Sequence, residues 1–115
     1  MQRGDVYLID FEPVIGSEAN KRRPAIIVSN DGASLTAARL GRGVVTVVPV
    51  TSSAERIYPF QVRLPAAATG LNRDSKAQAE QVRSVSVRRV GSKLGSVPGN
   101  LLAELDEALR LHLGL

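Results

Sequence analysis

The side chains of this sequence that are best suited to chemistry are an arginine and a threonine, Arg23 and Thr51. Arg23 ends a cationic loop and directly precedes Pro24, which disfavours helical backbone at the residue before it. The guanidinium is therefore expected on extended backbone at the start of a strand, where its planar fork can bind two phosphate oxygens. Thr51 directly follows a valine-rich run and could donate a further hydrogen bond to the same oxygens.

Two β-prone runs must position these side chains. Residues 24–29 are largely apolar, which predicts a strand covered on both faces, and residues 43–51 are the most valine-rich run of the chain. Arg23, at the start of the first strand, and Thr51, at the end of the second, can meet only if the two strands run antiparallel. Such pairing would place a fixed cation beside a hydroxyl donor.

The rest of the sequence predicts further strands separated by loops. Short β-prone or alternating segments lie between residues that favour turns, such as Gly, Pro, Asn and Asp. The expected strands are 5–11, 60–64 and 93–97, with one or two more within 75–90 that break near Val87, and the expected loops are 12–23, 52–58 and 65–74.

Two helices complete the predicted fold. A short one at 33–40 follows a turn at 30–32, and a longer one begins after Pro98. We therefore predict a mainly β chain with helices (α+β), forming one domain over residues 1–115. In the longer helix, apolar side chains recur at steps of three and four: Leu101, Leu105, Ala108, Leu109 and His112.

Composition excludes several kinds of chemistry. The sequence has no cysteine, so disulfides, thiolate catalysis and thiolate metal sites are not available. His112 is the only histidine, which rules out two-histidine cleavage of RNA and zinc-dependent hydrolysis within one chain. The few aromatic residues, two Tyr and two Phe, argue against extensive stacking of bases. Any chemistry must therefore come from Arg, Lys, carboxylates and hydroxyls, and we expect no cofactor.

Charge and hydropathy bear on partners and location. There are 15 Lys and Arg against 11 Asp and Glu, a net charge of +4 that many proteins carry without binding nucleic acid. The first residues contain no apolar core of a signal peptide, and the longest apolar run, 44–50, is too short to cross a bilayer. We expect a cytoplasmic protein that does not bind membranes.

Three polar motifs allow more than one interpretation. The triplet at 21–23 taken alone is typical of a solvated charge run or of a surface ion pair with Glu18. The segment 80–84 places four polar residues around Val82 inside a predicted strand, which favours a rim that contacts a ligand because a strand normally buries one face. His112 belongs to an apolar stripe, so partly buried packing is favoured over catalysis.

Together these segments resemble the MazF/PemK family of toxin endoribonucleases. The resemblance implies an SH3-like barrel of the MazF/PemK/CcdB type, active as a homodimer and neutralised by a small antitoxin whose acidic, disordered segment covers a basic groove. It also implies sequence-specific cleavage of single-stranded RNA at short sequences without a metal ion, usually leaving a 2′,3′-cyclic phosphate and a 5′-hydroxyl. The matching segments are 3–7, 16–18 with 23–24, 48–52, 75–76 and 80–84.

The resemblance also assigns roles to individual residues. The family's arginine before proline falls on Arg23 and the threonine of Val-Pro-Val-Thr-Ser falls on Thr51, so these are the predicted catalytic residues. Glu18 is the nearest carboxylate in sequence that could act as general base, because an arginine stays protonated at neutral pH. The predicted RNA-binding residues are Gly16, Ser17, Glu18, Lys21, Arg22, Ser52, Ser53, Glu80, Gln81 and Arg83.

The same fold leaves two other functions open. A DNA gyrase poison of this barrel type would bind protein and cut nothing, and a non-catalytic RNA-binding barrel would need only the net positive charge. A phosphate-binding pair such as Arg23 and Thr51 argues against the poison, which has no use for one.

Overall fold

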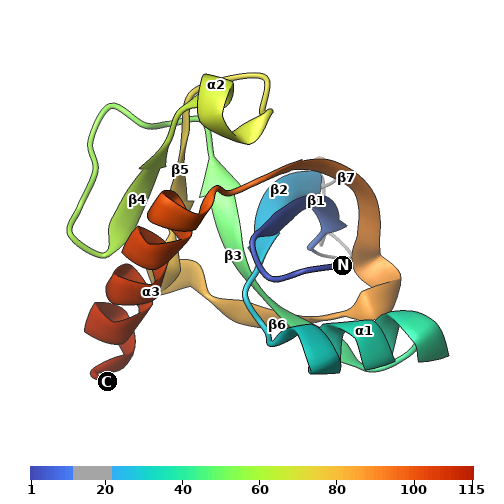
Figure 1. Cartoon of the computed structure of the whole chain (residues 1–115). Coiled ribbons are helices and arrows are strands. Elements are labelled where there is room, and N and C mark those ends of the chain that lie inside the picture. The colour runs from blue at the N-terminus through green and yellow to red at the C-terminus, as the bar shows by residue number, and fades with distance from the viewer. Residues whose placement is uncertain (12–21) are drawn as a thin grey trace, which may run out of the picture.

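The structure, a computed structural model, describes residues 1–11 and 22–115 and consists of a curved antiparallel sheet with helices at its ends and on one face (Figure 1). The strands are β1 (Asp5–Asp10), β2 (Arg22–Ile27), β3 (Val44–Thr51), β4 (Gln61–Leu64), β5 (Ser75–Gln78), β6 (Arg83–Ser86) and β7 (Val90–Ser96). The helices are α1 (Asp31–Leu40), α2 (Ala66–Thr69) and α3 (Gly99–Leu113), with 3₁₀ turns η1 (Ala79–Gln81) and η2 (Val87–Arg89).

Strand β3 is the centre of the sheet. The strand order is β4-β5-β3-β2-β1-β7, and β6 also pairs with β3. The first half of β3 pairs with β6 through Val44–Val47, whereas its last two residues, Val50 and Thr51, pair with β5. Because one strand joins different neighbours along its length, the sheet curls into a barrel-like shape (Figure 1). The predicted α+β class is confirmed.

Two hydrophobic clusters lie on opposite faces of β2 and β3. Ala25, Ile26 and Ile27 have no exposed surface, and successive side chains of a strand point to opposite faces. The prediction that this strand is covered on both sides is therefore confirmed. One cluster includes Ile26, Val48 and Val50 and is covered by Leu105 and Ala108 of α3, and the other includes Ile9, Ala25, Ile27, Val45 and Val47.

Helix α3 packs its first three turns and leaves the last one exposed. Leu105 and Ala108 are buried, whereas His112 and its neighbours Leu111 and Leu113 are exposed. The expectation of a partly buried His112 is therefore wrong, because the apolar stripe stops meeting the sheet one turn earlier. Among the described residues, no helix is long and apolar enough to cross a membrane.

Helix α2 lies within the predicted loop 65–74. Pro65 precedes it in extended backbone, and Gly70 ends it with a φ of +82°, a conformation that favours glycine. The Asp74 carboxylate accepts a hydrogen bond of 2.9 Å from the Ala66 N–H, which would otherwise lack a partner at the helix start. This hydrogen bond comes from a residue beyond the far end of the helix. The helix itself is too short for the alanines to show a helical period, so the sequence did not predict it.

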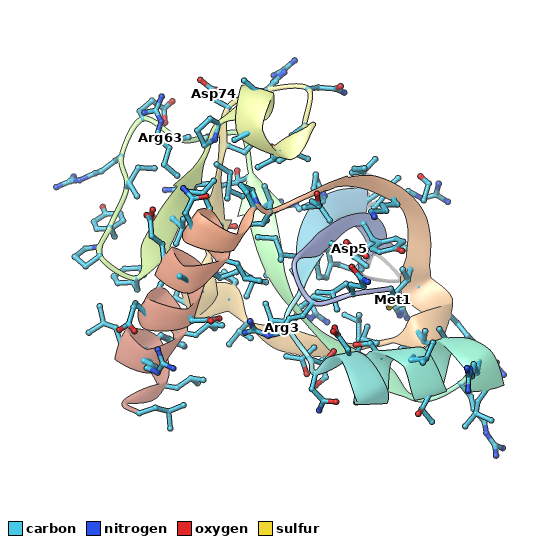
Figure 2. All side chains as sticks on the ribbon, viewed as in Figure 1. Met1, Arg3, Asp5, Arg63 and Asp74 are labelled. Atoms are coloured by element: carbon cyan, nitrogen blue, oxygen red, sulfur yellow. The ribbon has the colours of Figure 1, made fainter. Side chains whose placement is uncertain are left out.

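The motif Arg3-Gly4-Asp5 joins the N-terminus to two helices. Arg3 donates from its backbone N–H to Asp31 Oδ1 at 2.7 Å, from Nε to the Val28 carbonyl at 2.8 Å and from Nη2 to Asp106 Oδ1 at 2.7 Å. Its side chain lies between α3 and α1 (Figure 2). This part of the family resemblance has a structural explanation.

Candidate active site

Arg23 lies at the start of β2, on extended backbone as predicted. Strand β2 begins at Arg22, two residues earlier than expected, because Arg22 and Arg23 continue the ladder with β1 by pairing with Asp10 and Ile9. The Arg23 side chain is exposed. It makes no hydrogen bond or ion pair with any other side chain in residues 1–11 and 22–115, so this part of the structure leaves its guanidinium donors available.

The register between β2 and β3 brings Thr51 to the same place. The two strands run antiparallel and their ladder ends with Ala25 paired to Pro49, so Arg23 and Thr51 each lie two residues beyond this last pair, at the same end of the two strands. Opposite residues of antiparallel strands carry their side chains on the same face. The antiparallel arrangement that Arg23 and Thr51 need in order to meet is therefore present. Their part in catalysis stays a prediction.

The Thr51 hydroxyl is oriented by Ser53, two residues later in the loop. Its Oγ1 accepts a hydrogen bond of 3.2 Å from the Ser53 backbone N–H. A hydroxyl has one O–H donor besides its two acceptor positions, so this contact leaves the proton free to be donated elsewhere. A fixed oxygen with an available proton next to a guanidinium can bind an oxyanion such as a phosphate.

Lys76 lies beside Thr51 on the next strand of the sheet. The sequence did not assign this lysine to the site. Lys76 of β5 is paired with Thr51 on the side away from β2, and only 9% of its surface is exposed. Its Nζ donates a hydrogen bond of 2.8 Å to the Arg56 carbonyl in the loop between β3 and β4. Sequence reasoning missed this residue because a lysine in a short alternating strand is usually solvated.

The segment 80–84 is only partly a strand, which corrects the prediction made for it. Glu80 and Gln81 form the 3₁₀ turn η1, and β6 begins at Arg83. The polar residues at 80 and 81 thus interrupt the sheet, so they do not need an apolar face. Glu80 accepts a hydrogen bond of 2.8 Å from Gln61 Nε2, a structural contact at the start of β4, while Gln81 is exposed.

Arg83 shares the face of the sheet that carries Thr51. It is paired with Val47, which lies four residues before Thr51 on β3, or about 13 Å along the strand. Its guanidinium carbon lies 5.2 Å from the centre of the Phe11 ring. The structure thus places Arg83 on the same face as Thr51, and its predicted part in binding RNA stays a prediction.

The other predicted RNA-binding residues divide into three groups. Ser52 and Ser53 are exposed directly after Thr51. Arg22 is also exposed, but strand alternation directs it to the face opposite Arg23, where it lines a cavity of about 200 Å³ with Arg88 and Arg89. The remaining residues, Gly16, Ser17, Glu18 and Lys21, lie outside the described residues.

A larger cavity, of about 260 Å³, lies beside Pro24 of β2 and Val50 of β3, on the face of these strands opposite Arg23 and Thr51. Its apolar wall includes Pro24, Val50 and Leu94, and its polar rim includes Ser52 and Arg73. No group of three or more His, Asp and Glu side chains that could hold a metal ion occurs in residues 1–11 and 22–115.

Comparison with known proteins identifies the family. Residues 2–113 match the model for the PemK-like, MazF-like toxin of type II toxin–antitoxin systems. The chain belongs to this family. It is 57% identical over 115 residues to the Mycobacterium tuberculosis endoribonuclease MazF9, covering 100% of this chain and 98% of that protein. It is 30% identical over 115 residues to the Bacillus subtilis endoribonuclease EndoA, covering 100% and 96%.

Solved structures of PemK-like, MazF-like toxins have the same fold. MazF from Deinococcus radiodurans superposes with a TM-score of 0.74 at 31% identity, covering 100% of this chain and 97% of that one. A MazE–MazF structure from the same organism gives a TM-score of 0.77 at 31% identity, covering 100% and 96%. The barrel predicted from the resemblance is therefore confirmed.

Proposed function

We propose that Arg23 and Thr51 form the phosphate-binding centre of an endoribonuclease toxin that cuts single-stranded RNA without a metal ion. The observation that supports this proposal is the antiparallel pairing of β2 and β3, which brings Arg23 and Thr51 to the same end of the two strands. The endoribonuclease names of relatives that match over the whole chain support the same reaction. The proposed toxin domain covers residues 1–115.

The proposed reaction is attack of a ribose 2′-hydroxyl on the adjacent phosphorus. The 2′-oxygen loses its proton and forms a bond to phosphorus, the bond to the 5′-oxygen breaks, and the leaving oxygen takes up a proton. The products are a 2′,3′-cyclic phosphate and a 5′-hydroxyl. Negative charge builds up on the non-bridging oxygens, where paired hydrogen bonds from Arg23 and one from the Thr51 hydroxyl stabilise it.

Binding the reacting groups in line is a large part of the proposed catalysis. Holding a nucleophile near its target contributes several kcal/mol, about 7–11 in well-oriented cases, without any strong base. Glu18 remains the proposed base. Glu80 is a poorer candidate because Gln61 occupies one of its oxygens. Arg23 stabilises charge in this scheme and could donate the proton to the leaving group.

Partners follow from the charge of the proposed groove. Arg23 and Arg83 are exposed cations on one face of the sheet, which suits an RNA backbone and also an acidic, disordered antitoxin segment that competes for the same surface. The neighbouring MazE–MazF structure supports an antitoxin partner. We further propose that the toxin acts as a homodimer in the cytoplasm, where its RNA substrates are.

The test is incubation of the purified protein with RNA of mixed sequence, followed by mapping of the new 5′ ends. We expect discrete cuts that persist in excess chelator and fail at any site carrying a single 2′-deoxy sugar. Cleavage that the chelator abolishes, or that proceeds through a 2′-deoxy site, would contradict the proposed reaction. Binding without cuts would favour the RNA-binding barrel, and neither binding nor cuts would favour the gyrase poison.

A further inference from the structure

Lys76 is a buried lysine in the row of residues that contains Thr51. Strand β5 lies between β3 and β4, so Lys76 has Thr51 on one side and Arg63 on the other. Only 9% of its surface is exposed. Because burial of a charged ammonium is unfavourable unless its protons are bonded, the structure must provide partners for Nζ.

Those partners belong to the loop of residues 52–60, which joins β3 to β4. The ammonium donates to the Arg56 carbonyl at 2.8 Å and lies 5.7 Å from the centre of the Tyr58 ring. The Arg56 guanidinium carbon lies 5.1 Å from the centre of the same ring, and Tyr58 stacks on Phe60 with 5.4 Å between ring centres. Lys76 therefore holds the middle of the loop through a charged hydrogen bond and a cation–π contact.

The two ends of this loop are fixed as well. At its start, the Ser53 N–H donates to Thr51 Oγ1 at 3.2 Å. At its end, the Tyr58 N–H donates to Gln61 Oε1 at 3.1 Å, and Gln61 Nε2 donates to Glu80 at 2.8 Å. The loop is thus a segment with fixed backbone that starts at the Thr51 hydroxyl.

The loop side chains, in contrast, are available to a ligand. Ser52, Ser53 and Glu55 are exposed, and their hydroxyl and carboxylate groups match the hydrogen-bonding edges of unpaired bases. A site distinguishes ligands best when its contacting groups sit on backbone that other interactions keep in place. The anchored loop offers such a surface immediately beside Thr51.

We propose that Lys76 is a positioning residue that holds the 52–60 loop next to Thr51, so that the loop selects the bases flanking the cut. This inference rests on the proposed function. The RNA itself is contacted by the loop and the phosphate-binding pair, and Lys76 acts through Arg56 and Tyr58 from beneath them.

The test compares Lys76→Met, which keeps the length of the side chain and removes its charge, with Lys76→Arg, which keeps a cationic donor. Lys93→Met is the matched control, because Lys93 lies on β7 and its Nζ is 3.4 Å from Asp5 Oδ1, away from the loop. Two readouts are needed for each protein: the cleavage rate at each site of a mixed-sequence RNA, and the rate of tryptic cutting after Arg56, followed by mass spectrometry.

For Lys76→Met we expect tryptic cutting after Arg56 to be about tenfold faster, as loss of one charged hydrogen bond predicts. We also expect the cleavage rate at preferred RNA sites, divided by the rate at other sites, to fall about tenfold, because the loop that selects the bases loses the same hydrogen bond. Lys76→Arg should recover part of both properties, and Lys93→Met should change neither. A purely structural lysine would lower all RNA cuts by one factor and leave their ratio unchanged.

Each other outcome is decisive. An unchanged RNA cleavage ratio in Lys76→Met would overturn the role in base selection, even if the loop becomes easier to cut. An unchanged tryptic rate after Arg56 would overturn the anchoring contact itself. If the unsubstituted protein cuts no RNA, the proposed function fails and base selection fails with it. Faster tryptic cutting in Lys76→Met would still show, in that case, that Lys76 holds the 52–60 loop.

Discussion

Two arginines near the starts of neighbouring strands have opposite surroundings in this protein. Arg3 is about one-third exposed and has a carbonyl and a carboxylate on its guanidinium, which connects the chain before β1 to α3. Arg23 is exposed and has no hydrogen-bond or ion-pair partner for its side chain in the described part of the chain. Both are part of the resemblance to the toxin family, yet their environments differ.

We infer that the difference separates an arginine that stabilises the fold from one that binds a ligand. The Arg3 donors are used within the protein, so removing them leaves a carboxylate without its cation and lowers stability. The Arg23 backbone is held by pairing with Ile9 of β1, and its guanidinium has no hydrogen-bond or ion-pair partner in residues 1–11 and 22–115, so we infer that these donors act on an anion. Substituting both arginines in the same way would test this distinction.

The largest effect is expected for Arg23→Met. Loss of a charge-stabilising donor should lower the RNA cleavage rate by about 10²–10³-fold, whereas the free energy of unfolding should change by less than about 0.5 kcal/mol. Cleavage kinetics and denaturant unfolding measure the two quantities. Arg23→Lys should recover only part of the rate, since an ammonium lacks the planar fork. A folded Arg23→Met variant that cuts RNA at the original rate would remove the basis for the active site.

Thr51→Val should have the next largest effect. The substitution keeps the shape of the side chain and removes the O–H donor, which predicts a loss of about 10²-fold in cleavage rate. Thr51→Ser retains the hydroxyl and should keep most of the activity. Thr46→Val, on the same strand, is the control and should cut RNA normally. Equal rates for the two valine variants would show that the Thr51 hydroxyl plays no part.

Arg3→Met should give the reverse result to Arg23→Met. Its two guanidinium hydrogen bonds are partly exposed, so their loss should reduce the free energy of unfolding by about 1–2 kcal/mol. The cleavage rate per folded molecule should stay the same. Unfolding in denaturant and cleavage assays well below the transition measure both. A large drop in cleavage rate at full folding would contradict the structural role of Arg3.

The smallest effect is expected for a third arginine, Arg63. Figure 2 shows Arg63 and Asp74 near α2, and their ion pair of 3.7 Å joins side chains that are 63% and 59% exposed. Exposed pairs of this kind contribute about 0–1 kcal/mol, so Arg63→Gln should be nearly silent in unfolding and in cleavage. A loss of unfolding free energy as large as that of Arg3→Met would show that the exposed fraction of an arginine side chain does not predict its contribution to stability.

The sequence predicted the elements that carry the site better than the connections around them. The valine-rich run and Pro24 correctly indicated β3 and the extended start of β2, because local β propensity and proline geometry act within a few residues. For Glu80 and Gln81 the sequence predicts strand, whereas they lie in the turn η1. Glu80 is held there by Gln61, a contact from a distant part of the chain that local propensity does not reveal.

By itself, the sequence determined which side chains could do chemistry and on what kind of backbone they would lie. Only the tertiary structure decided which of them meet. The antiparallel pairing that brings Arg23 and Thr51 to the same end of β2 and β3, and the burial of Lys76 beneath a loop, depend on contacts between residues far apart in the chain. Local periodicity carries no information about such pairing, because strand alternation repeats every two residues whichever strand lies alongside.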